Sequence, residues 1–245
     1  MSATSLDSPF SNLPPEQVFL ESLLNARSSL FFLQIGANDG QDFVGALVRR
    51  YRRIRNIGGL LVEPQPYFCE RLQATYADVK GVRILNCAIS DRRGSRTLYH
   101  VDYNHRDLPA WTKGLGTLRK DVLLSHANLV SSLDSRIREL QVACITVADL
   151  LQMIGDTRID VLITDTEGYD FVILKQFDFA TVRPQLIVYE SKHLSADDFE
   201  SCERLLSGFG YRVVHFYNDN SAALLNGVSI LDGNAGIAGS RGRGA

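Results

Sequence analysis

Hydrophobic and polar positions follow two alternating patterns along most of the chain. Short apolar runs are followed by longer stretches in which apolar residues recur at helical spacing. Strands that alternate with helices are typical of βαβ units, so we predict an α/β fold: a Rossmann-like, mostly parallel seven-stranded sheet with helices on both faces. The predicted strands are Leu30–Ile35, Gly59–Val62, Arg83–Cys87, Val161–Thr164, Leu186–Tyr189, Arg212–Phe216 and Ala222–Leu225.

The helical stretches combine an apolar face with a polar one. In the second of them, Phe43, Leu47, Tyr51 and Ile54 share the apolar face. Most arginines of this stretch fall on the solvated face, which argues against an anion-binding patch; they are Arg49, Arg50, Arg52, Arg53 and Arg55. The predicted helices are Glu16–Arg27, Asp42–Ile54, Tyr67–Tyr76 and Ala196–Phe209.

A single domain is predicted over residues 1–231, with an N-terminal packing helix at 14–28. The segment 103–140 interrupts the alternation of strands and helices and contains the single tryptophan, Trp111. Long insertions of this kind tend to be lids or binding loops, so we predict that this one covers a bound molecule. Residues 232–245 are rich in glycine and poor in apolar side chains, which predicts a disordered tail.

Composition favours a small or neutral partner. Lysine and arginine number 26 against 28 acidic residues, so the net charge of −2 draws the protein to neither nucleic acid nor an anionic membrane. No apolar run reaches the roughly 20 residues that span a bilayer, and the start lacks the pattern of a signal peptide. The four scattered cysteines suit a reducing compartment. We therefore expect a cytoplasmic protein without nucleic-acid or membrane partners, and the sequence leaves homo-oligomerisation open.

A glycine-containing turn follows the first strand, in the segment FFLQIGANDGQ. In open α/β sheets, ligands bind at the carboxyl ends of strands, where such a turn and the next helix offer backbone N–H groups. The turn consists of Gly36, Ala37, Asn38, Asp39 and Gly40. Because Asn38 and Gln41 occupy the second and third glycine positions of GxGxxG, the pattern disfavours NAD. We expect another charged cofactor here.

An acidic residue ends the next predicted strand. Glu63 follows GGLLV, and Pro64 stops the strand directly after it. A carboxylate at this point can accept hydrogen bonds from both hydroxyls of a ribose. Together with the glycine turn one strand earlier, Glu63 predicts an adenosine site.

Five segments, in order, resemble the FkbM-type methyltransferases, a family within the Rossmann-like class I enzymes that use S-adenosylmethionine. They are IGANDG, LVEPQPYFCERL, LNCAIS at Leu85–Ser90, ITVADLL at Ile145–Leu151 and DVLITDTEGYDFVILK at Asp160–Lys175. The resemblance covers roughly Phe31 to Asn218. Thr166 replaces the aliphatic residue commonly found in the last motif, whereas Asp165, Glu167 and Gly168 are in place.

The resemblance implies methylation of a hydroxyl oxygen, often on a sugar or a secondary metabolite, so the expected partner is a small-molecule or glycan hydroxyl acceptor. It also implies that Gly36, Asn38 and Gly40 flank the methionine part of S-adenosylmethionine. By the same analogy Glu63 holds the ribose, and Asp165 lies beside the reacting centre. Cys87 and Ala88, just after the third strand, lie near the adenine.

Carboxylates end the fourth and fifth strands, at Asp165, Glu167 and Glu190. Any of them can act as a base toward the acceptor hydroxyl, and together they could hold Mg²⁺, which would orient the acceptor and lower its pKa. Glu167 can instead cap the helix that follows.

Histidines provide further candidate bases. His193 lies just past the fifth strand and can take a proton at neutral pH. His105 and His126, inside the interrupting segment, are less firmly placed. The predicted catalytic set is therefore Asp165, Glu190 and His193.

Two other functions stay open at this point. A nicotinamide-dependent oxidoreductase would have a similar fold, although the missing glycines argue against it. A catalytically silent binding protein could also keep the cofactor fold.

Overall fold

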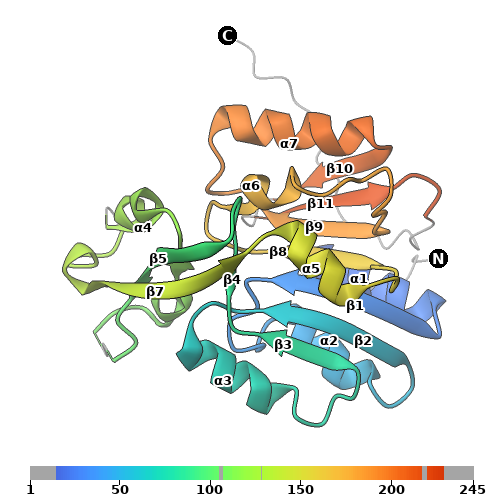
Figure 1. Ribbon diagram of the computed structural model, residues 1–245, viewed down its shortest axis with the longest axis horizontal. Coiled ribbons are helices and arrows are strands. Elements are labelled where there is room, and N and C mark those ends of the chain that lie inside the picture. The colour runs from blue at the N-terminus through green and yellow to red at the C-terminus, as the bar shows by residue number, and fades with distance from the viewer. Residues whose placement is uncertain (1–14, 105–106, 128, 217–219, 229–245) are drawn as a thin grey trace, which may run out of the picture.

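The computed structural model describes residues 15–104, 107–127, 129–216 and 220–228, which form two sheets and their helices (Figure 1). His105 and the predicted tail at 232–245 lie outside these residues. The larger sheet has seven strands in the order β10-β11-β9-β8-β1-β2-β3. Its strands in chain order are β1 Ser29–Ile35, β2 Asn56–Val62, β3 Val82–Leu85, β8 Val161–Thr164, β9 Leu186–Glu190, β10 Tyr211–His215 and β11 Asn220–Leu225.

Parallel pairing dominates this sheet, which confirms the predicted fold class. Strands β3, β2, β1, β8 and β9 pair in parallel, whereas β11 is antiparallel to both of its neighbours. The strand order reverses at β1, because β2 pairs on one side of it and β8 on the other. Ligands of open α/β sheets bind at the carboxyl ends of the strands beside such a reversal. The topology therefore places the expected site at the ends of β1, β2 and β8.

Helices cover both faces of the seven-stranded sheet. Alternate residues of β1 point to opposite faces, so Phe32 packs with α1, α2 and α3, whereas Leu33 packs with α5, α6 and α7. The helices are α1 Pro15–Ala26, α2 Phe43–Tyr51, α3 Pro66–Thr75, α4 Lys120–His126, α5 Val147–Ile154, α6 Asp170–Leu174 and α7 Ala196–Gly208. Helices α5 and α6 and the small α4 add to the four that the pattern predicts.

The smaller sheet was not predicted. It projects from the carboxyl side of the main sheet and has the order β4-β7-β5-β6 (Figure 1). Strands β5 and β7 pair antiparallel along eight residues and share a small core around Leu123 and Leu133. The predicted insertion at 103–140 is the outer part of this unit. Its elements are β4 Ala88–Ile89, β5 Gly94–Val101, β6 Gly116–Thr117, β7 Ile137–Ile145 and the 3₁₀ helices Ala110–Gly114 and Asp134–Arg136.

Helix α2 is shorter than predicted. Asp42 caps it by accepting a hydrogen bond from the Gly45 N–H (2.8 Å), and the helix ends at Tyr51. Ile54 therefore lies beyond the helix and is 65% exposed, so its predicted place on the apolar face is wrong. Arg50 and Arg52 pair with Glu21 and Asp78, in agreement with a solvated face rather than an anion site. Among the described residues, no helix has the length and apolar content needed to cross a membrane.

Candidate functional site

The turn after β1 places backbone N–H groups at the carboxyl end of the sheet. Gly36 has φ +84°, and a Cβ atom there would lie 1.7 Å from the backbone oxygen of Asp165. Only glycine permits this close approach of the ends of β1 and β8. Asn38 also adopts a left-handed conformation, with φ +49°, which asparagine tolerates better than most residues. The turn therefore presents its backbone to the space above the sheet.

Glu63 connects the ends of β1 and β2 through hydrogen bonds. Its Oε2 accepts a hydrogen bond from the Asn38 N–H and its Oε1 accepts one from the Gln65 N–H, both at 2.8 Å. The residue is only 3% exposed, and this burial raises the pKa of its carboxyl group to about 7, although the two N–H donors oppose the shift. Each oxygen keeps a second lone pair, so the carboxylate can still accept the two hydroxyls of a ribose.

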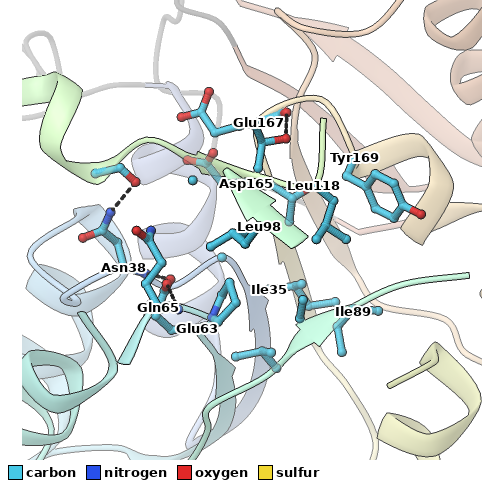
Figure 2. A pocket seen from close by; sticks show the side chains of 18 of the residues that line it. Ile35, Asn38, Glu63, Gln65, Ile89, Leu98, Leu118, Asp165, Glu167 and Tyr169 are labelled. Carbon is cyan, nitrogen blue, oxygen red and sulfur yellow. Dashed lines mark hydrogen bonds between the residues drawn. The ribbon is translucent and has the colours of Figure 1, made fainter. Parts of the chain in front are cut away.

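A cavity of about 810 Å³, open mouth included, lies above the ends of β1, β2, β3 and β8 (Figure 2). The polar side chains of Asn38, Glu63 and Gln65 lie together at one side of it, and Asp165 and Glu167 lie at another (Figure 2). Between these polar groups the wall is apolar, formed by Ile35, Val62, Ile89, Leu98 and Leu118.

The cavity brings together most of the predicted cofactor residues. Its lining includes Gly36, Asn38, Glu63, Pro64, Cys87, Ala88 and Asp165. The other three residues of the turn do not line it. Ala37 is buried beside α2, Asp39 accepts a hydrogen bond from the Gln41 N–H, and Gly40 packs against α3.

The smaller sheet supplies lining residues that sequence reasoning missed. Gly116 in β6 approaches the Gln65 side chain so closely that an added Cβ would lie 2.5 Å from Gln65 Nε2. The carbonyl of Gly114 accepts a hydrogen bond from Asn38 Nδ2 (3.2 Å), and Thr117 donates one from Oγ1 to the Glu167 carbonyl (2.7 Å). This segment therefore crosses from one strand end to the other. Gln65 could have been found from the sequence, because it stands only two residues past Glu63 and directly after Pro64. No sequence pattern marked β6.

Carboxylates crowd the ends of β8 and β9. Oxygen atoms of Asp165, Glu167 and Glu190 lie within 4.8 Å of one another, so the predicted carboxylate set is brought together. The Asp165 side chain is accessible through the cavity, yet partial desolvation by the surrounding protein, followed by repulsion from Glu167 and Asp170, raises its pKa. Burial, followed by repulsion from Glu167, raises the pKa of Glu190 to about 11. The raised pKa favours the protonated, neutral form of Glu190 when no cation is bound.

Asp170 holds the turn that carries two of these carboxylates. It is fully buried at the start of α6, and its Oδ2 accepts a hydrogen bond from Thr166 Oγ1 (2.9 Å). Burial raises the pKa of Asp170 to about 6. Glu167, with φ +53°, does not cap α6, because the capping position belongs to Tyr169 and has no side-chain cap. The turn instead directs Glu167 toward the cavity (Figure 2).

A second cavity adjoins the first. Trp111, Asp165 and Glu167 line both, and the second is otherwise lined by Leu115, His126, Glu190, Lys192, His193 and Asn220. His193 Nε2 lies 3.3 Å from Glu167 Oε2 and 3.5 Å from Glu190 Oε1. The structure thus groups the predicted catalytic residues Asp165, Glu190 and His193 around one space. It also adds His126 from α4, whose ring meets that of His193 edge to face at 4.8 Å.

Comparison with known proteins agrees with this geometry. A family model described as the methyltransferase FkbM domain matches residues 34–213. Curated proteins gave no match.

One solved structure supports the fold assignment, and two others are more distantly similar. The methyltransferase FkbM from Methylobacillus flagellatus KT is 14% identical in sequence, with a TM-score of 0.50. The match covers 80% of the present chain and 44% of that protein, so the present chain spans less than half of its length. A ribosomal protein L11 methylase from Lactobacillus delbrueckii subsp. bulgaricus has 8% identity and a TM-score of 0.41, covering 84% of this chain and 74% of its own. An S-adenosylmethionine-dependent methyltransferase from Geobacter sulfurreducens, in complex with S-adenosyl-L-homocysteine, has 11% identity and a TM-score of 0.38, with coverages of 82% and 66%.

Proposed function

Because the chain belongs to the FkbM methyltransferase domain family and has the class I fold, we propose that it transfers the methyl group of S-adenosylmethionine to a hydroxyl oxygen of a sugar or secondary metabolite. The observation that carries this proposal is the meeting of two cavities at Asp165 and Glu167. A cofactor in the first cavity and an acceptor in the second would face each other there. Methyl transfer needs such an in-line arrangement.

The first cavity suits the parts of S-adenosylmethionine. Glu63 would accept the ribose hydroxyls, and the backbone of the Gly36–Asn38 turn would approach the methionine part. The apolar wall around Leu98 and Leu118 would bury the adenine. Cys87 and Ala88 line the same region.

In the proposed reaction the acceptor oxygen forms a bond to the methyl carbon, and the carbon–sulfur bond breaks with its electron pair left on sulfur. The products are the methyl ether and S-adenosylhomocysteine, and the acceptor proton passes to a base. Asp165 is the best placed base, because it borders both cavities and is more exposed than Glu167, the other described carboxylate that borders both. Glu190 would instead donate a hydrogen bond when no cation is bound, and His193 is the alternative base.

The segment 111–119 would cover the acceptor. Trp111 is 49% exposed and borders both cavities, as expected for a side chain that contacts a bound molecule. Thr117 and Gly114 hold this segment against the two strand ends that carry the cofactor site. Acceptor selectivity is therefore assigned to the smaller sheet and its loops.

A labelled-methyl screen tests the proposal. The chain is incubated with methyl-labelled S-adenosylmethionine and separate pools of sugars, glycosides and hydroxylated metabolites. Label is expected in an ether stable to base. Label on nitrogen or carbon alone, or no label with any pool, would contradict hydroxyl methylation.

Replacing Glu63 by alanine is expected to weaken S-adenosylhomocysteine binding by about 1.5–3 kcal/mol, the range for loss of a charged hydrogen-bonding partner. Isothermal titration calorimetry measures the change. Glu70→Ala on α3, outside the lining, is the control and should bind as the unmodified chain does. Equal affinities for Glu63→Ala and the unmodified protein would exclude Glu63 as the ribose ligand.

S-adenosylhomocysteine affinity is also expected to rise with pH. Two ribose hydroxyls can donate only to the ionised carboxylate, and burial places the pKa of Glu63 at about 7. Ionisation therefore rises from about 9% at pH 6 to about 91% at pH 8, and the affinity should rise about tenfold over that interval. Calorimetry at both pH values measures it, and Glu63→Gln should remove the dependence. An affinity that falls toward pH 8 would refute this assignment.

A further inference from the structure

The second cavity contains a group of side chains whose close approach to one another the methyl-transfer proposal does not explain. It combines two imidazoles with carboxylates, drawn from three parts of the chain. His126 comes from α4, Glu167 follows β8, and Glu190 and His193 lie at the end of β9 and just after it. The nitrogen and oxygen donors of His126, Glu167 and His193 lie within 4.8 Å of one another, as do those of Asp165, Glu167 and Glu190.

The spacing fits donors that share one metal ion. Metal–nitrogen and metal–oxygen bonds of about 2.1 Å at tetrahedral angles place donor atoms about 3.4 Å apart. His193 Nε2 lies 3.3 Å from Glu167 Oε2 and 3.5 Å from Glu190 Oε1. Two imidazoles on one ion have ring centroids about 5 Å apart, and those of His126 and His193 are 4.8 Å apart.

A buried carboxyl group with an unsatisfied oxygen points independently to a ligand. Glu190 is 7% exposed and lines the cavity, and its Oε2 has no hydrogen-bond partner within the described part of the chain. Buried polar atoms are rarely left without a partner, because the loss of water is not compensated. A cation in the cavity would satisfy this oxygen.

We propose that the chain binds one divalent transition-metal ion, of the class of Zn²⁺, Mn²⁺ and Co²⁺, through His126, Glu167, Glu190 and His193. Imidazole ligands favour ions such as Zn²⁺, and a mixed set of imidazoles and carboxylates also suits Mn²⁺ and Co²⁺, whereas Mg²⁺ prefers oxygen ligands and water. The histidines therefore favour a transition-metal ion over the Mg²⁺ that the carboxylates alone could hold. The ion would join α4 of the smaller unit to the ends of β8 and β9.

The ion would also face the acceptor. Asp165 lines the same cavity and the cofactor cavity. A metal-bound acceptor hydroxyl has a lowered pKa, so its proton is removed more easily. This catalytic role rests on the proposed methyltransferase function, whereas the binding of the ion does not.

Binding of Co²⁺ to the full chain tests the site without any methyl transfer. The protein is treated with EDTA, freed of the chelator and titrated with Co²⁺ while its visible absorption is recorded. One Co²⁺ per chain and displacement by Zn²⁺ are expected. His126→Gln and His193→Gln should each weaken binding of Co²⁺ by at least about 100-fold. Loss of an outer-shell partner already weakens metal binding by up to about 100-fold, and loss of a direct ligand should weaken it at least as much. His215→Gln is the matched control, since His215 also faces a glutamate, Glu203, at 3.8 Å but lies outside the group.

Circular dichroism without metal shows whether each variant is folded, and Glu190→Gln replaces any variant that is not. Failure of the unmodified chain to bind Co²⁺ or Zn²⁺ would overturn the proposal. So would binding that persists in both histidine variants, or binding of Mg²⁺ alone. Because S-adenosylhomocysteine plays no part in this titration, its result is independent of the proposed reaction.

Discussion

Replacing Asp165 by asparagine is expected to slow methyl transfer by about 100-fold or more, the cost of losing an acid–base group. Asparagine keeps the shape of the side chain at the junction of the two cavities but cannot take the acceptor proton. The release of S-adenosylhomocysteine, in the presence of an acceptor from the labelled-methyl screen, measures the rate. Asp78→Asn on the exposed surface is the control carboxylate.

The same replacement should not destabilise the metal-free protein. The pKa of Asp165 is raised in the folded chain, first by desolvation and then by Glu167 and Asp170. A carboxyl group with a raised folded-state pKa costs stability as the pH rises above its unfolded value, and asparagine removes that cost. The free energy of unfolding at pH 8 should therefore stay the same or increase. Near-normal turnover in Asp165→Asn would exclude Asp165 as the base.

Gly36→Ala is expected to have the largest effect on stability. The added Cβ would lie 1.7 Å from the Asp165 carbonyl oxygen, and φ is +84°. Forced separation of β1 from β8 and the left-handed backbone together should lower the free energy of unfolding by at least about 3 kcal/mol. Cofactor binding should be lost as well, since both strand ends line the cavity. Denaturant unfolding measures the stability.

Gly81→Ala separates the two contributions. Gly81 has φ +87°, but an added Cβ would meet its nearest atom at 3.5 Å, an ordinary contact. Its cost should therefore be only the roughly 1–2 kcal/mol of the left-handed backbone. Equal losses in the two variants would show that the contact between Gly36 and Asp165 is unimportant.

The seven-stranded sheet was predictable because its strands are buried between two layers of helices. All four residues of β8 are buried, so its apolar run is unbroken and visible in the sequence. The smaller sheet was not predictable in the same way. Three of the first five residues of β7 are exposed and charged or polar, and the first two residues of β5 are exposed, which hides the alternation.

The residues of the site were likewise predictable on the main sheet and not predictable on the smaller sheet. Gly36, Glu63 and Asp165 stand directly after buried strands, so the sequence revealed both the residues and their common edge. Leu98 and Gly116 belong to the smaller sheet, and nothing in the sequence placed them over the cofactor cavity. The approach of His126 to His193 depends on the position of α4 relative to the end of β9, and the hydrophobic pattern of the sequence does not specify that position.

Calorimetric titration of the unmodified chain with S-adenosylhomocysteine, beside an identical titration with NAD, tests the central claim most directly. The cavity is shaped by a turn without the glycines of a dinucleotide site and by a carboxylate positioned for a ribose. We predict saturable binding of one S-adenosylhomocysteine per chain and no binding of NAD. Binding of NAD without S-adenosylhomocysteine, or of neither by a folded chain, would contradict the account.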